Sequence, residues 1–123
     1  MNKLPVLLCI FLLSACAPSE VPSYKLVDRN GIKYEINSQI PFTGVSTDYY
    51  ENGRLKEKYT YKDGEQNGLN EGYHENGQLL WKGTFKDGEL NGLWEAYREN
   101  GQEENFFPKC YQNGKKVDMS KCK

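Results

Sequence analysis

The sequence predicts an all-β protein: an elongated antiparallel β-meander of roughly seven to nine strands, built from stacked β-hairpins of about 24 residues each. The tripeptide Glu-Asn-Gly recurs at residues 51–53, 75–77 and 99–101. Asn-Gly and Asp-Gly pairs favour tight hairpin turns, and nine of the twelve glycines follow Asn or Asp. Between these turns polar and apolar residues alternate with a period of two, which is typical of strands with one face toward a core. Because a lone hairpin cannot bury such a face, we expect neighbouring repeats to stack.

Residues 1–15 have the features of a secretory signal peptide that is later cleaved. A single positive charge at Lys3 precedes an apolar run over residues 4–13 and small residues before Cys16. The run is about half the roughly 20 residues that a membrane-spanning helix needs. The sequence Leu-Ser-Ala-Cys at residues 13–16 resembles the lipobox of bacterial lipoproteins, which implies that Cys16 is acylated, for example with palmitate, and becomes the mature N-terminus. The alternative is a plain signal peptide that ends at an incidental cysteine.

The lipobox resemblance also implies a location in the cell envelope. Ala17, rather than Asp, follows the cysteine, and by resemblance to Gram-negative lipoproteins this implies the outer membrane. Lipoproteins of this kind carry several acyl chains, which together anchor a protein stably. We therefore expect residues 16–25, which include Pro and Ser, to form a short lipid-anchored tether.

Beyond the tether we predict a lead-in β-hairpin over residues 26–43, repeats over residues 44–114, and a C-terminal tail over residues 115–123. Cleavage removes Cys9 and leaves Cys110 and Cys122, in a compartment where disulfides persist. Their spacing does not match a CxxC redox pair, and a metal site lacks partner ligands. We predict a structural disulfide that holds the tail.

The spacing of the glycines predicts how each hairpin turns. Asp63-Gly64 and Asn67-Gly68 are too close together to flank a strand, so we expect them to bound one connection of four to six residues. Asn52-Gly53 and its equivalents supply the tight turn at the other end. Strand alternation predicts an aromatic-rich face and places Trp94 on the opposite face. The residues assigned to the aromatic face are Val45, Thr47, Tyr49, Leu55, Glu57, Tyr59, Tyr61, Leu69, Glu71, Tyr73, Leu79, Trp81, Gly83, Phe85, Leu93, Glu95 and Tyr97.

Residues 81–101, with their spaced glycines and aromatics, resemble the MORN repeat. The resemblance spans roughly residues 26–114, and the Tyr-Glu-Asn-Gly form of the turn is similar to the bacterial group described as antitoxin-like MORN proteins. Two departures stand out: Tyr59 occupies the position of Gly83, and Glu103-Glu104-Asn105 replaces the apolar start of a strand. The resemblance implies a repeat scaffold, and more narrowly a protein that neutralises a toxin.

Composition and motifs indicate a protein that is not an enzyme and needs no cofactor. Sixteen Lys and Arg against seventeen Asp and Glu give a net charge of −1, which argues against a nucleic-acid partner. No P-loop, zinc motif, dinucleotide fingerprint or nucleophile elbow is present, and the only histidine, His74, is expected on a solvated face beside a turn. Glu71 and Glu95 could in principle perform acid–base chemistry on a sugar, but their recurrence one repeat apart indicates a copied structural position.

The aromatic residues are the best clue to function, since rigid amphipathic rings are common in binding surfaces. We predict that Tyr50, Tyr61 and Trp94 contact a partner, whereas Tyr73, Trp81 and Tyr97 serve mainly in a thin core. The leading hypothesis is a membrane-anchored scaffold that holds an unknown protein partner at the cell envelope. The alternative hypothesis is a module that binds glycan or peptidoglycan through the same aromatic residues, and a hydrolase is a third class.

Overall fold

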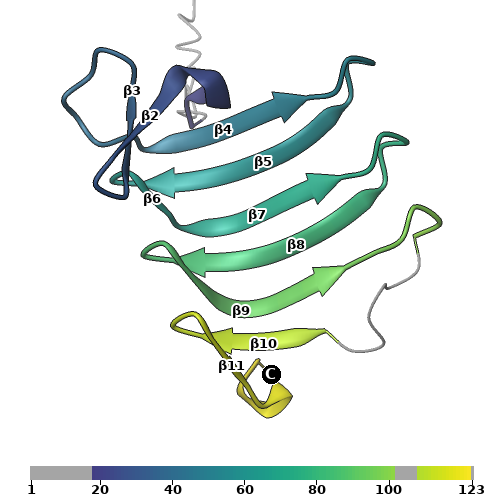
Figure 1. The fold of residues 1–123 in the computed structure, drawn as a ribbon. Coiled ribbons are helices and arrows are strands. Elements are labelled where there is room, and N and C mark those ends of the chain that lie inside the picture. Colours follow the sequence, from purple (N-terminus) through teal and green to yellow (C-terminus); the bar gives the residue numbers. More distant parts are fainter. Residues whose placement is uncertain (1–17, 102–107, 123) are drawn as a thin grey trace, which may run out of the picture.

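A computed structural model of the chain describes residues 18–101 and 108–122, and it confirms the predicted all-β meander of hairpins (Figure 1). Two short 3₁₀ helices, η1 (Ser23–Lys25) and η2 (Met119–Cys122), accompany the strands in these ranges. The strands are β1 (Glu20–Pro22), β2 (Leu26–Arg29), β3 (Ile32–Glu35), β4 (Gly44–Tyr49), β5 (Leu55–Lys62), β6 (Glu65–Gln66), β7 (Gly68–Tyr73), β8 (Leu79–Lys86), β9 (Glu89–Ala96), β10 (Lys109–Gln112) and β11 (Lys115–Val117).

The main sheet has nine strands in the order β1-β4-β5-β7-β8-β9-β10-β11, with β6 paired to β5. From β4 onward each strand pairs antiparallel with the next, so the hairpins succeed one another along a single sheet, as Figure 1 shows. A separate two-stranded sheet, β2-β3, lies beside the end of the main sheet that contains β4. Its Lys33 N–H donates to the Gly64 carbonyl at 2.9 Å and fixes the lead-in hairpin to the first repeat.

The start of the described chain is part of the sheet, so the tether predicted over residues 16–25 is wrong for residues 20–25. β1 pairs parallel with β4, with Glu20 opposite Val45 and Pro22 opposite Thr47. Val21 is buried and joins Phe42 and Tyr61 in a small core, against which Leu26 and Tyr59 pack. Burial of this apolar side chain favours ordering the segment as a strand. Cys16, the predicted lipidation site, lies outside the described residues.

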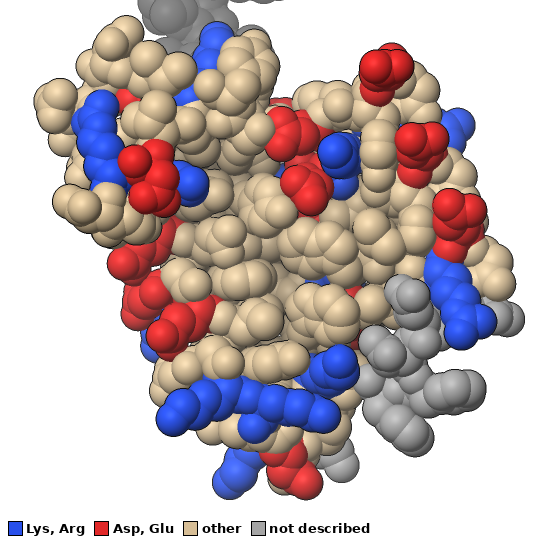
Figure 2. All heavy atoms as spheres, in the orientation of Figure 1, with Lys and Arg blue, Asp and Glu red and all other residues tan. Residues whose placement is uncertain are grey.

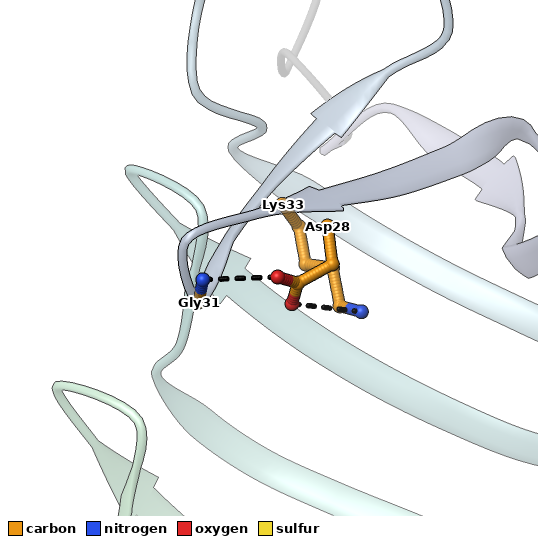
Figure 3. Close-up of polar contacts among 3 residues, drawn as sticks. All are labelled: Asp28, Gly31 and Lys33. Carbon is orange, nitrogen blue, oxygen red and sulfur yellow. Dashed lines mark hydrogen bonds and ion pairs between the residues drawn. The ribbon is translucent and has the colours of Figure 1, made fainter.

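The lead-in hairpin turns at Asn30 and Gly31, both at positive φ (55° and 83°), as a two-residue type I′ turn requires. Figure 3 shows how Asp28 holds this turn: its carboxylate accepts a hydrogen bond from Gly31 N–H at 2.9 Å and pairs with Lys33 Nζ at 3.3 Å. These contacts, the Gly31 hydrogen bond foremost, lower the pKa of Asp28. Within the segment predicted as a lead-in hairpin, residues 26–43, the two paired strands cover residues 26–35.

The turns of the repeats are of two kinds. Asp63-Gly64 and Asp87-Gly88 are two-residue turns in which both residues have positive φ, and Lys62 lies directly opposite Glu65. The Glu-Asn-Gly turns are longer: Tyr50 N–H donates to the Arg54 carbonyl, and Gly53 N–H donates to the Tyr50 carbonyl. This is a three-residue loop made of a type I turn closed by a left-handed glycine.

The pair Asn67-Gly68 does not bound a loop, contrary to the prediction, but forms an irregularity within the returning strand. Tyr61 lies opposite Gln66, and a regular ladder would then place Asn70 opposite Glu57, yet Glu57 lies opposite Gly72. The two additional residues are accommodated because the buried Asn70 side chain accepts a hydrogen bond from Thr60 N–H at 2.7 Å. A side chain thus takes the place of the missing backbone partner.

The C-terminal end is closed by the predicted disulfide between Cys110 in β10 and Cys122 in η2, whose Cα atoms lie 5.9 Å apart. Cys110 is fully buried, and β11 pairs antiparallel with β10. The predicted tail therefore consists of an edge strand and a 3₁₀ helix tied back to the sheet.

We predict that replacing both cysteines, as Cys110→Ser/Cys122→Ser, lowers the free energy of unfolding by about 2–4 kcal/mol, because the cross-link restricts the unfolded chain. Urea denaturation of the oxidised wild type and the double variant measures the difference. The variant should match the wild type treated with reductant. Equal stability of the oxidised wild type and the variant would contradict the prediction.

Candidate binding face

A row of large side chains crosses one face of the sheet from β5 to β9. Tyr59 in β5 and Trp81 in β8 lie with ring centroids 6.0 Å apart, and Trp94 follows in β9. We call this surface the aromatic face and define it by Tyr59, Trp81, Phe85, Leu90 and Trp94, all of which are half-buried. The lead-in packs against the β4–β5 end, and no second layer of described residues covers β7, β8 and β9 (Figure 1).

The strand register shows that the predicted assignment of the two faces was wrong in part. Trp81 lies opposite Gly72, and Trp94 lies opposite Gly83, so the two tryptophans share a face. Leu69, Glu71, Tyr73 and Glu95 lie on the other face. The cause is a one-residue shift of register in the β4–β5 hairpin, between Asp48 and Tyr49, and in the β7–β8 hairpin, between Gly72 and Tyr73. Because side chains alternate along a strand, such a bulge exchanges the faces of every residue beyond it.

Each tryptophan packs onto a glycine of the preceding strand. A Cβ atom at Gly72 would lie 2.1 Å from Trp81 Nε1, and a Cβ atom at Gly83 would lie 2.9 Å from Trp94 Cδ1. Neither glycine has positive φ, so the close approach of the indole ring is the constraint that requires glycine. Gly72 and Trp81 are nine residues apart, and Gly83 and Trp94 are eleven residues apart. Each pair packs one strand against the next.

We predict that Gly72→Ala destabilises the protein by about 1–3 kcal/mol, because the added methyl group displaces the Trp81 ring. Urea denaturation, followed by tryptophan fluorescence, should show an earlier midpoint and a shifted emission maximum in the native state. Leu69→Ala in the same strand, whose side chain is exposed on the opposite face, serves as a control and should change stability by less than about 0.5 kcal/mol. An unchanged midpoint for Gly72→Ala would contradict the packing constraint.

Charged residues border the aromatic face but leave its centre uncharged. Asp48 and Glu57 are cross-strand neighbours at the β4–β5 end, and Lys109 Nζ lies 5.5 Å from the Trp94 ring centroid at the β10 end. Figure 2 shows this face, with tan residues over its middle and blue residues at the β10–β11 end. Burial, together with the Glu57 carboxylate, raises the pKa of Tyr59 to about 12, so its hydroxyl keeps its proton.

Two of the three predicted partner-binding residues have structural surroundings that the sequence did not indicate. Tyr61 is only 8% exposed, and its ring centroid lies 5.8 Å from that of Phe42. Tyr61 is therefore part of the core and not of a contact surface. Tyr50 is half-buried, and its hydroxyl donates to the Tyr73 carbonyl at 2.7 Å. Trp94 is half-buried on the aromatic face and is the one candidate placed where a partner could reach it.

The Glu-Asn-Gly turns are joined to one another by equivalent side chains. Asn52 Nδ2 donates to the Glu75 carbonyl at 3.1 Å, and Asn76 Nδ2 donates to the Glu99 carbonyl at 2.9 Å. His74, expected on a solvated face, instead lies 2.8 Å from the Tyr97 carbonyl through Nε2. Because a carbonyl only accepts, Nε2 carries the proton. His74 therefore bonds a backbone carbonyl of the next repeat, as Tyr50 does in the first repeat. The two residues are 24 positions apart in the sequence, and this spacing could have predicted their equivalent roles.

The opposite face carries a row of tyrosine–carboxylate pairs. Tyr73 donates to Glu71, and Tyr97 donates to Glu95 at 2.7 Å. The first repeat has Thr47 where the others have glutamate, and there Glu20 of β1 supplies the carboxylate: its Oε1 accepts from Tyr49 at 3.0 Å and from Thr47 at 3.1 Å. Strand β1 thus completes a position that the first repeat lacks.

Charges of alternating sign cross the same face from strand to strand. Lys58 lies opposite Glu71, Glu71 opposite Lys82, and Lys82 opposite Glu95, with Lys82 Nζ 3.2 Å from Glu95. The Tyr97 hydrogen bond, followed by the Lys82 contact, lowers the pKa of Glu95, and burial next to Glu71 raises the pKa of Tyr73 to about 12. Both carboxylates are thus engaged in a structural row, which supports the copied-position interpretation over acid–base chemistry.

We predict that Glu95→Gln reduces the acid sensitivity of the protein. Because the pKa of Glu95 in the folded chain lies below its ordinary value of 4.5, its stabilisation is present above that value and is lost as the pH falls through the lowered pKa. The loss of unfolding free energy between pH 7 and pH 3.5 should therefore be smaller in the variant than in the wild type. Glu51→Gln, at an exposed turn residue, should retain the full pH dependence; an identical profile for Glu95→Gln would contradict the prediction.

Residues 18–101 and 108–122 contain no group of three or more His, Cys, Asp or Glu side chains that could hold a metal ion. Within the same ranges no helix has the length and apolar character to span a membrane.

Two segments of the chain, residues 42–63 and 66–87, match the family described as MORN repeat variant. They coincide with the β4–β5 and β7–β8 hairpins. No curated protein and no solved structure matches the chain. The chain therefore carries repeats similar to the MORN variant, as the sequence predicted, and a third hairpin, β9–β10, continues the same sheet beyond the matched segments.

Proposed function

We propose that this chain is a lipid-anchored repeat module that binds a protein partner at the bacterial cell envelope through its aromatic face. MORN-type repeats support a repeat-based interaction module. The observation that carries the choice of face is that Tyr59, Trp81 and Trp94 lie on one face of three successive repeats, which no second layer of described residues covers. Half-buried aromatic rings held rigidly by packing are the residues that most often dominate binding energy.

The opposite face is a weaker candidate for the same role. Its carboxylates already have partners: Glu71 accepts a hydrogen bond from Tyr73, and Glu95 accepts one from Tyr97 and pairs with Lys82. A partner docking there would have to replace these contacts, and exposed ion pairs contribute little to affinity. The aromatic face offers apolar area whose removal from water is favourable.

The borders of the aromatic face suggest what chemistry the partner presents. An apolar or aromatic segment would lie on Trp81 and Trp94. A basic group would meet Asp48 and Glu57, and an acidic group would meet Lys109. Such complementary charges orient a partner and speed its association.

Anchoring rests on the lipobox-like sequence that ends at Cys16. Acylation there would hold the repeats at the outer membrane of a Gram-negative bacterium. The resemblance to antitoxin-like MORN proteins supports a narrower role, neutralisation of a toxin as an immunity protein, for which the aromatic face would be the contact surface.

Site-specific photocrosslinking in cells tests the proposed face. A photoreactive phenylalanine analogue at position 94 should crosslink to a discrete protein, whereas the same analogue at position 69, exposed on the opposite face, should not. The purified partner should then bind Trp94→Ala at least 10-fold more weakly than the wild type, with an unchanged far-UV circular dichroism spectrum. Crosslinks from position 69 alone, or undiminished binding of Trp94→Ala, would overturn the proposed face.

The glycan-binding hypothesis gives a different outcome in the same system. If the wild type binds purified peptidoglycan fragments, Trp94→Ala loses this binding, and the protein that carries the photoreactive analogue at position 94 yields no protein crosslink, the partner is a glycan and the protein scaffold is rejected.

A further inference from the structure

Three exposed apolar side chains surround the point at which the described chain enters the sheet. Tyr24 in η1 is 74% exposed, and Ile36 and Ile40 after β3 are 51% and 76% exposed. Only two other large hydrophobic residues of the described ranges are comparably exposed, and both lie in the strands of the repeats: Tyr49 and Leu69. Exposed apolar residues gathered in one region mark an interaction site.

The entry point is built so that these side chains stay beside it. Val45 N–H donates to the Ser19 carbonyl at 2.8 Å, and the Ser19 backbone lies directly against Gly44. Ile36 N–H donates to the Lys25 carbonyl at 2.9 Å, which fixes the segment after β3 against η1. Two shallow hollows flank the entry: Pro22, Tyr24 and Ile36 line one, and Ser19, Ile40 and Pro41 line the other.

Little chain separates this surface from the proposed site of acylation. Cys16 and Glu20 are four residues apart in the sequence, which corresponds to at most about 14 Å of extended backbone. An acylated Cys16 therefore could not hold the domain at a distance. β1 is also the first strand of the main sheet, so this edge of the sheet would face the lipid.

We propose that Tyr24, Ile36 and Ile40 form a membrane-contact surface that rests in the lipid interface next to the acylated N-terminus. This inference rests on the proposed anchoring at Cys16. The occupant is a bilayer because the anchor would bring lipid to this surface and to no other part of the described chain. Tyrosine and isoleucine suit an interface where one side is apolar and the other is wet.

Contact through these side chains would be apolar rather than electrostatic. The charged groups that line the two hollows are Glu20, Lys25, Glu35 and Asp63, and Arg29 lies close by, so positive charge is not in excess there. Glu20 accepts hydrogen bonds from Thr47 and Tyr49, and Arg29 donates to the Ser38 carbonyl at 2.8 Å. Among the described residues around the entry point, no cluster of lysines or arginines is available to attract anionic lipid, so the contact should persist in high salt.

Tryptophan quenching in vesicles tests the contact. The full-length lipidated protein is reconstituted in phosphatidylethanolamine–phosphatidylglycerol vesicles that contain brominated acyl chains, which quench indole fluorescence at short range. Ile40→Trp should add emission that is quenched at least twofold relative to unbrominated vesicles, and 0.5 M NaCl should not relieve the quenching. Leu69→Trp, the matched control on β7, should add emission that is not quenched.

The outcomes separate the contact from the anchor. If the protein remains on the vesicles but the added tryptophan of Ile40→Trp is not quenched, or if both variants are quenched equally, the contact surface is overturned while anchoring stands. Mass spectrometry of the mature wild type and Cys16→Ser tests the anchor: acylation should be present in the first and absent in the second. A wild type without acylation would overturn the anchoring itself and this inference with it.

Discussion

The packing of each tryptophan on a glycine of the neighbouring strand is the contact on which the rest of this structure depends. A single-layered sheet has no opposing layer, so its apolar residues must pack on the sheet itself. At Gly72 and Gly83 there is room for an indole ring only because a Cβ atom is absent. The rings of Trp81 and Trp94 therefore pack over these glycines, link successive strands, and remain half-exposed.

The opposite face of the sheet and the edge formed by the Glu-Asn-Gly turns carry the other stabilising contacts. The face opposite the tryptophans holds the tyrosine–carboxylate pairs and the alternating charges, which satisfy one another. Along the edge, Asn52 and Asn76 join each Glu-Asn-Gly turn to the next. Because equivalent atoms recur in each repeat, stability is distributed along the array as interactions between nearest neighbours. Strand β1 joins the same pattern because Glu20 supplies the carboxylate that the first repeat lacks.

Sequence reasoning was sufficient for features set by local chemistry and insufficient for those set by register. The 24-residue period, the hairpins and the Cys110–Cys122 bridge were predicted because turn residues and cysteines are visible in the sequence. The face of Trp94 was not, since the one-residue bulges of the β4–β5 and β7–β8 hairpins exchange the two faces of the sheet and leave no signature in the alternation of polar and apolar residues. Burial of Tyr61 also escaped prediction, because it depends on the lead-in segment that packs on it.

The strand order has a consequence for the dimensions of the assembly. With β1 at one end and β11 at the other, every hairpin adds two strand spacings, about 10 Å, along a single axis. In a chain held at Cys16, that axis would point away from the bilayer, so the number of repeats would set the height at which Trp81 and Trp94 stand above the lipid. Duplicating or deleting one 24-residue unit would change this height while leaving the chemistry of each unit intact, so the array would act as a molecular ruler.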